Sequence, residues 1–189
     1  MKFILVKRIG MNKKNFSQKG ILLGADILLL AILIFIDQLT KHFAVLYLKD
    51  KTAVSIIDGV FELKYLENRG AAFGMLQNQK FFFIFIALVI LAVIAYVLVK
   101  TPNQRKYVKL HIALVFVAGG ALGNMIDRCR LDYVVDFLYF SLINFPIFNV
   151  ADIYVTLSAI FLVILLLFVY KESDLNFLSL RTKKYRDVK

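Results

Sequence analysis

The stretch FFFIFIALVILAVIAYVLV, residues 81–99, contains no charged side chain and decides the class of protein. A helix needs roughly 17–25 mostly apolar residues to cross the hydrocarbon core of a bilayer, and this run is long enough unaided. Residues 153–170 form a second such run. The chain is 60% hydrophobic, which is more than a soluble domain of 189 residues can hide in its interior. Lipid is therefore the expected solvent for most of this protein.

Two further apolar runs complete the set. Residues 21–36 are short, but helical continuation through Asp37 to Phe43 gives them the length of a span. Residues 110–126 are interrupted only at His111 and Asn124. The expected fold is an all-α membrane protein with four transmembrane helices, at about 21–43, 81–99, 110–127 and 147–170. Pro146 is expected to open the last of them.

The amino terminus has two interpretations. Residues 1–20 resemble the basic leader of a secretory signal peptide, but no small-residue cleavage site follows Ile36. The first run is therefore expected to be a retained helix. The predicted organisation is a basic segment at 1–20, one membrane domain at 21–170 and a basic tail at 171–189.

The net charge of +11 at first suggests a nucleic-acid partner, but its distribution argues against one. Residues 1–20 carry six bases and no acid, residues 100–109 carry four and none, and residues 171–189 carry six against three acids. Residues 37–80 are nearly balanced, with six bases and five acids. This alternation predicts that both termini are cytoplasmic, by the positive-inside rule. The tail can be solvated or can touch anionic lipid.

Residues 52–68 break the helical pattern. Apolar residues recur at every second position on both sides of Asp58-Gly59, which is a strong local signal for a β-hairpin. The alternating residues are Val54, Ile56, Phe61, Leu63 and Tyr65. A small extracytoplasmic sheet next to the membrane is therefore expected.

Polar side chains inside or beside apolar runs are costly in lipid, so they are candidates for function. The charge pattern places most of them on the extracytoplasmic side. They are Asp37, Asn68, Arg69, Asn124, Asp127, Arg128, Asp136, Asn149 and Asp152. Asn124 and Asp127 are three residues apart, as are Asn149 and Asp152, so each pair shares a face of any local helix. Each asparagine can then donate a hydrogen bond to a nearby carboxylate.

Three carboxylates, those of Asp127, Asp136 and Asp152, cannot all stay ionised together where the dielectric constant is low. Arg128 is expected to neutralise its neighbour Asp127. The other two would then share a proton, as in the aspartic proteases, with one activating water and the other acting as acid. The alternative is that such acids mark the membrane boundary and that Asn/Asp pairs hold helices together. Spacing alone leaves both alternatives open.

The remaining conspicuous residues predict structure rather than chemistry. Gly119 and Gly123 form a GxxxG pattern and are expected to let the third helix pack closely. His111 and the single cysteine, Cys129, are expected to be structural, and Asp26 is unexplained. His42 and His111 lie far apart without cysteine partners, which argues against a zinc site, so no metal or other cofactor is expected.

Other classes of membrane protein fit less well. A proton-coupled transporter would also keep acids in its helices, but such proteins show more helices, repeats and polar residues near the midplane. A scaffold subunit would not need such a cluster of acids, arginine and asparagines. A serine peptidase lacks support because no histidine adjoins Ser141 or Ser158.

Five segments, in this order, resemble the signature blocks of the bacterial lipoprotein signal peptidases, also called signal peptidase II. They are Asp37–Lys41, Asn68–Gly74, Gly120–Arg128, Val134–Phe137 and Phe148–Asp152. The resemblance implies four helices in the bacterial cytoplasmic membrane, cytoplasmic termini, and an extracytoplasmic sheet beside the active site.

The resemblance also assigns roles. It implies that Asp136 and Asp152 are the catalytic aspartates. The supporting shell would be Asp37, Asn68, Asn124, Asp127, Arg128 and Asn149. The implied substrate is a lipoprotein precursor with diacylglycerol on its cysteine, cut just before that residue, and globomycin-type lipopeptides are the expected inhibitors. No metal and no nucleic acid are implied.

Overall fold

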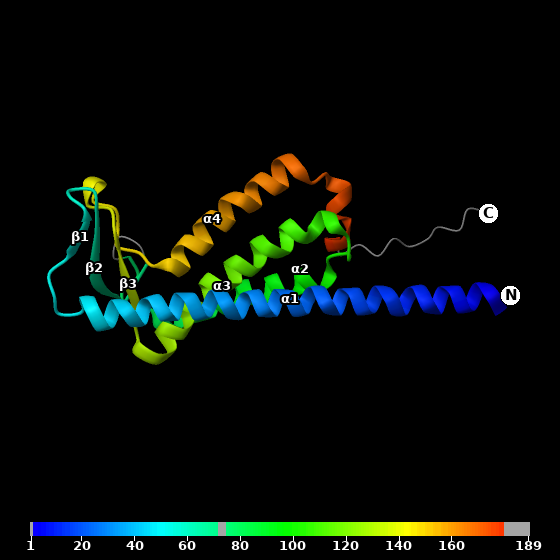
Figure 1. Ribbon diagram of the computed structural model, residues 1–189, viewed down its shortest axis with the longest axis horizontal. Helices are drawn as coiled ribbons and strands as arrows, with labels where there is room; N and C mark the ends of the chain where they lie inside the picture. The colour runs from blue at the N-terminus through cyan, green and yellow to red at the C-terminus, as the bar shows by residue number, and fades with distance from the viewer. Residues whose placement is uncertain (1, 72–74, 180–189) are drawn as a thin grey trace.

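The computed structural model describes residues 2–71 and 75–179, with side chains from Gln18 onward. Long helices run along one axis and a small sheet stands at one end, here called the sheet end (Figure 1). Within the described part of the chain, four helices are long and apolar enough to cross a membrane. Ala72, Phe73 and Gly74 of the second motif, and residues 180–189 of the predicted tail, lie outside the described residues. The predicted four-helix membrane fold is confirmed.

The helices differ from the predicted ranges mainly at their ends. Helix α1, Lys2–Leu48, is continuous and extends beyond both ends of the predicted span at 21–43. No proline interrupts residues 2–20, and single glycines weaken a helix without ending it. Helix α2 is Lys80–Lys100, and α3, Val108–Leu131, follows the short 3-10 helix η2, Arg105–Tyr107.

The start of α4, Val150–Ile164, corrects the expectation for Pro146. Asn149 caps this helix, because its side chain accepts a hydrogen bond from the Asp152 amide at 3.0 Å. The Asp152 carboxylate accepts in return from the Asn149 amide at 3.1 Å, which completes a capping box. Pro146 therefore lies in the connection before the helix. A single π turn, η4 Leu165–Val169, continues α4, and the 3-10 helix η5, Glu172–Leu178, follows it.

The sheet has three antiparallel strands in the order β1-β2-β3. Strand β1, Val54–Ile57, and strand β2, Phe61–Asn68, form the predicted hairpin, whose turn contains Gly59 at a φ of +70°. Strand β3, Val134–Tyr139, comes from the segment after α3, and a 3-10 helix, η3 Ser141–Ile143, follows it. The sheet packs on the end of α1, where Val135 and Phe137 meet Ala44 and Leu48.

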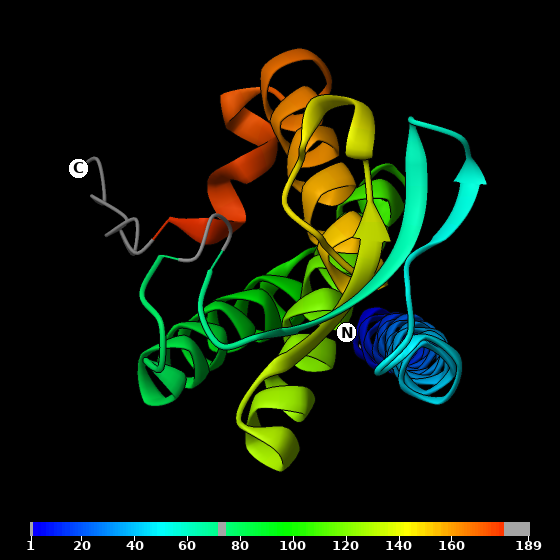
Figure 2. The same cartoon turned by 90° about the vertical axis from the view of Figure 1, so that its left-hand side faces the viewer.

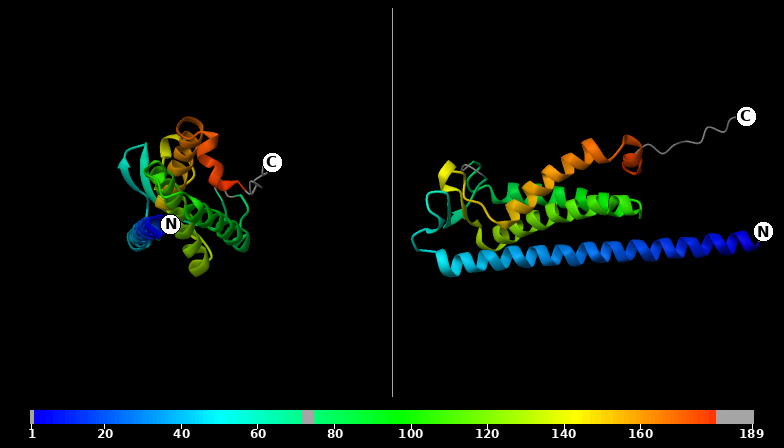
Figure 3. Two further views of the ribbon diagram at one scale, coloured as in Figure 1. Left: turned by 90° about the vertical axis from the view of Figure 1, so that its right-hand side faces the viewer. Right: turned by 45° about the horizontal axis from the view of Figure 1, so that its top comes forward.

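Helix α3 packs against each of the other three membrane helices, and Figure 3 shows it running beside α1. The glycines of α3 make this possible. A Cβ at Gly119 would lie 3.0 Å from the Leu33 Cβ of α1, and one at Gly120 would overlap the Ala151 carbonyl of α4. A Cβ at Gly123 would overlap the Asp37 carboxylate. The GxxxG pattern therefore serves close packing, as predicted.

Asp26 and His111 form a polar contact between two helices. The Asp26 Oδ2 lies 2.6 Å from the His111 Nδ1, and both residues are buried between α1 and α3. A buried polar group is costly unless it is paired, so this contact joins the two helices at a fixed register. Cys129 is exposed.

Candidate active site

Two aspartates from different elements line one cavity at the sheet end of the helices. Asp136 lies on β3, and Asp152 lies in the first turn of α4. The cavity holds about 470 Å³, and its polar lining is Asn68, Asn124, Arg128, Thr156 and the two aspartates. Apolar side chains, including Phe145 and Leu157, cover much of the rest. Ionising both acids in one largely apolar space would carry a high free-energy cost.

Asp136 is almost wholly buried, at 1% exposure. Its two carboxylate oxygens accept hydrogen bonds from the side-chain amides of Asn68, at 2.8 Å, and Asn149, at 2.6 Å. Burial, and next the charge of Asp152, raise the pKa of Asp136 to about 7, although the two amide donors oppose the shift. Asp136 therefore has the environment of a carboxyl that keeps its proton near neutral pH.

Asp152 lies in surroundings unlike those of Asp136. It is the third residue of α4, where the partial positive charge of the helix N-terminus stabilises an anion. One of its oxygens accepts from the Asn149 backbone amide, and the other accepts from the Asn124 side chain at 2.8 Å. The two candidate aspartates thus differ in kind, which is the condition for an acid and a base in one site.

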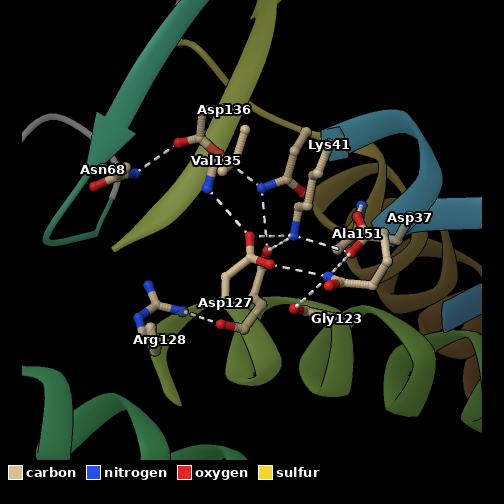
Figure 4. Close-up of polar contacts among 12 residues, drawn as sticks. Asp37, Lys41, Asn68, Gly123, Asp127, Arg128, Val135, Asp136 and Ala151 are labelled. Carbon is tan, nitrogen blue, oxygen red and sulfur yellow. Dashed lines mark hydrogen bonds and ion pairs between the residues drawn. The ribbon is translucent and has the colours of Figure 1, made fainter. Parts of the chain in front are cut away.

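A buried lysine joins two further acids beneath this pair (Figure 4). The Lys41 ammonium lies 2.9 Å from both the Asp37 and the Asp127 carboxylates and 2.8 Å from the Asn124 side-chain oxygen. Lys41, Asp37 and Asp127 are each 3% exposed or less. The lysine offsets much of the charge that the two buried acids bring.

Each of these two acids also holds the backbone just before a candidate aspartate. Asp127 accepts from the Val135 amide at 3.1 Å, one residue before Asp136. Asp37 accepts from the Ala151 amide at 3.0 Å, one residue before Asp152. Helices α1 and α3 therefore fix the positions of both candidate catalytic residues through the main chain.

The side-chain oxygen of each of the three asparagines is occupied by a donor. Gly70 N donates to Asn68 at 2.9 Å, Lys41 donates to Asn124, and Asp152 N donates to Asn149. Because an amide has its oxygen and nitrogen on opposite sides, each NH2 group then faces a carboxylate of the pair.

Arg128 does not neutralise Asp127, so that expectation was wrong. Successive residues of a helix do not face each other, and Arg128 points away from its neighbour. Its guanidinium donates to the Gly70 carbonyl at 3.1 Å and lies 4.5 Å from the centre of the Phe83 ring. Lys41 takes the expected role instead.

The structure brings all eight predicted site residues together at the sheet end. The sequence interpretation missed Lys41 and Gln38, whose amide donates to Asp127 at 2.9 Å. A signal for Lys41 was present, since it lies four residues after Asp37 on the same helical face. Among residues 2–71 and 75–179, no three His, Cys, Asp or Glu side chains are placed to hold a metal ion. The expectation of a metal-free reaction stays a prediction.

Comparison with known proteins identifies the same region. The family model described as "Signal peptidase (SPase) II" matches residues 29–168. The lipoprotein signal peptidase of Caldanaerobacter subterraneus is 46% identical over 143 residues, covering 75% of this chain and 95% of that protein. The lipoprotein signal peptidase of Clostridioides difficile is 42% identical over 148 residues, covering 78% and 97%.

Solved structures agree in fold. A bacterial membrane enzyme determined at 1.9 Å by the in meso method superposes with a TM-score of 0.69 at 31% identity, over 78% of this chain and 95% of that one. A second such structure, at 2.3 Å, gives 0.69 at 32% identity, over 76% and 88%. Because the family model spans residues 29–168, which include the site just described and part or all of each of the four helices, this chain belongs to the signal peptidase II family.

Proposed function

We propose that this protein is an aspartic endopeptidase that removes signal peptides from diacylglyceryl-modified lipoprotein precursors, cutting before the lipidated cysteine. Membership of the signal peptidase II family supports a membrane protease that processes lipoproteins. The observation that carries the aspartic mechanism is the pair Asp136 and Asp152, which face one cavity in unlike environments. Globomycin-type lipopeptides are expected to inhibit it.

The reaction follows from those environments. Ionised Asp152 takes a proton from a water molecule, whose oxygen attacks the carbonyl carbon of the peptide bond. Protonated Asp136 donates its proton to the carbonyl oxygen as the tetrahedral intermediate forms. The intermediate then loses the amine, which receives the proton held by Asp152, while one hydroxyl group of the intermediate returns a proton to Asp136. The signal peptide leaves with a new carboxyl group, and the lipoprotein begins with the free amino group of its cysteine.

The pH dependence of cleavage should report the proton on Asp136. Since its pKa lies at about 7, the required protonated form is lost as the pH rises through that value. We therefore expect kcat/KM to fall on the alkaline side with a midpoint near pH 7. Asn68→Ala removes a hydrogen-bond donor that favours the ionised form of the Asp136 carboxylate, so the alkaline midpoint should move to higher pH. The shift should be roughly one pH unit or less, since a pKa change of one unit corresponds to about 1.4 kcal/mol of interaction energy.

The matched control for that profile is Lys64→Ala, an exposed change on the same strand. It should leave the alkaline midpoint in place. A downward shift in Asn68→Ala would contradict the assignment of the proton to Asp136.

Substrate would reach the site from the lipid. The cavity is lined by α3, α4 and β3, and its apolar wall includes Ile153 and Leu157 of α4. A precursor's apolar signal helix can approach laterally while the acyl chains on its cysteine stay in the bilayer. Each buried methylene contributes roughly 0.8 kcal/mol to such anchoring, so two chains would hold the scissile bond at a fixed depth.

The test of the function is kcat/KM for matched precursors with and without diacylglycerol on the cysteine. We expect the modified precursor to be cut faster by about 10² or more, because fixed positioning raises the effective concentration of the reacting groups. Globomycin should abolish the difference by blocking both. Equal kcat/KM values for the two precursors would show that the enzyme recognises the peptide sequence alone, which would contradict the proposed function.

The proposed orientation puts the sheet end outside the cytoplasm. Its support is the charge pattern, because the basic segments 1–20 and 100–109 fall at the other end of the helices. In a Cys129→Ala background, cysteines at the exposed positions Lys51 and Asp58 should react with an impermeant maleimide in intact spheroplasts. A cysteine at exposed Asn103 should react only after lysis, and the reverse pattern would place the aspartates on the cytoplasmic side.

A further inference from the structure

The connection between β3 and α4 contains a long run without charge. From Phe137 to Ala151 the sequence has neither an acid nor a base. Within it, Leu142 and Ile143 are each 68% exposed, and Phe140 and Phe145 are 41% and 45% exposed. These four residues are called the apolar tip below. Together they expose four large apolar side chains within six residues, separated only by Ser141 and Asn144.

Contacts within the connection hold the apolar tip in shape. The Phe145 amide donates to the Phe140 carbonyl at 3.1 Å, and the Tyr139 hydroxyl donates to the Asn144 side-chain oxygen at 2.7 Å. The Phe140 ring stacks on Phe148 with centroids 5.8 Å apart. An ordered turn therefore presents the two aliphatic side chains outward.

The apolar tip lies at the free end of the sheet, where the Leu142 amide donates to the Val60 carbonyl at 3.5 Å. This end projects sideways past the start of α4 and lies level with the end of α1 along the long axis (Figures 1 and 2). Helix α1 carries exposed apolar side chains up to that level, with Phe43 46%, Leu46 54% and Tyr47 59% exposed. The exposed apolar surface of α1 therefore extends to the level of the apolar tip, as expected for a helix that lipid surrounds to that depth.

We propose that the apolar tip inserts into the bilayer leaflet at the sheet end of the helices. A soluble surface rarely exposes large apolar side chains together, whereas lipid accepts them. Aromatic residues are enriched at membrane interfaces, and Phe140 and Phe145 flank the two aliphatic residues. The absence of charge from 137 to 151 removes the main cost of placing a segment in hydrocarbon.

Insertion would have a consequence for the cavity. Phe145 of the apolar tip lines the cavity that holds Asp136 and Asp152, as do Pro146, Ile147 and Phe148, which follow it directly. A tip held in the leaflet fixes the depth of that wall relative to the acyl chains. The contact with lipid itself stands independently of the reaction proposed for the cavity.

Fluorescence tests the insertion directly, because the chain contains no tryptophan. The full-length Leu142→Trp variant, reconstituted in phosphatidylcholine vesicles, would be compared with Lys51→Trp at the exposed α1–β1 connection. Phosphatidylcholine brominated on its acyl chains should quench most of the Leu142→Trp emission and little of the Lys51→Trp emission. Aqueous acrylamide should show the opposite order.

Two outcomes would overturn the proposal. Equal acrylamide quenching of both variants, without quenching by brominated lipid, would place the apolar tip in water. A blue-shifted Leu142→Trp emission that brominated lipid leaves unchanged, and that is lost when the protein is diluted with excess lipid, would show that a second copy of the chain covers the tip. Because neither measurement depends on cleavage, an inactive preparation gives the same answer.

Discussion

Asp136→Asn and Asp152→Asn should each reduce kcat by roughly 10³-fold or more, since general acid and base catalysis contribute about 10²–10⁴-fold each. Asparagine keeps the size of the side chain and removes the group that titrates. Each variant should still fold, because the amide at either position can keep accepting one of the present hydrogen bonds. The measurement is turnover of a diacylglyceryl-modified precursor, with thermal unfolding in detergent as the check on folding.

The double variant makes this test sharper. If the two aspartates act on one water molecule, losing the second after the first should cost little more, so the effects should be far from additive. Asp132→Asn supplies the matched control, because Asp132 is an exposed acid whose partner is Lys80 rather than a residue of the cavity. A single variant at Asp136 or Asp152 with near wild-type turnover would remove that residue from the mechanism.

Lys41→Met should have the second largest effect, on both stability and turnover. It leaves the buried carboxylates of Asp37 and Asp127 without their cation, and breaking such a buried pair costs about 3–5 kcal/mol. It also removes one of the two donors to the Asn124 side-chain oxygen, leaving only the Asn149 amide at 3.1 Å, so the group that donates to Asp152 is held less firmly. We expect a lower unfolding temperature and a fall in kcat of roughly 10²-fold, the cost of losing one oriented hydrogen bond in a reacting site.

A second variant separates the two effects. Adding Asp127→Asn to Lys41→Met removes one of the uncompensated charges and should recover much of the lost stability. Turnover should stay low, because Asn124 still lacks the hydrogen bond from Lys41. If the double variant recovers turnover together with stability, the role of Lys41 is confined to neutralising charge.

The membrane fold could be predicted because its main signal is local. Each span is an apolar run, and the hairpin is specified by Gly59 between two alternating stretches. Strand β3 was harder to predict because Val134 to Phe137 are all buried, so no alternation of polar and apolar residues marks them. The start of α4 depends on the reciprocal cap of Asn149 and Asp152, and the proline nearby was the weaker signal.

The candidate site was predicted as a set of residues but not as a network. Polar residues at the ends of apolar runs indicated which side chains would lie close together, and the eight predicted side chains do so. Which acid pairs with which base depends on contacts such as Lys41 to Asp127, 86 residues apart, and no local pattern encodes them. A lysine near the end of an apolar run is also expected to extend its ammonium toward water, and for this reason Lys41 was not predicted as a site residue.

The backbone contacts of Asp37 and Asp127 have a consequence for biogenesis. Asp37 lies on α1, the first helix to be synthesised, whereas the amide that it holds, that of Ala151, belongs to α4, the last. Asp127 and Val135 fasten the intervening sheet in the same way. A chain that has inserted only its first three helices therefore has Asp37 but lacks both the Ala151 amide and Asp152. If Asp136 and Asp152 are the catalytic pair, as proposed, the site is complete only after the last helix has inserted.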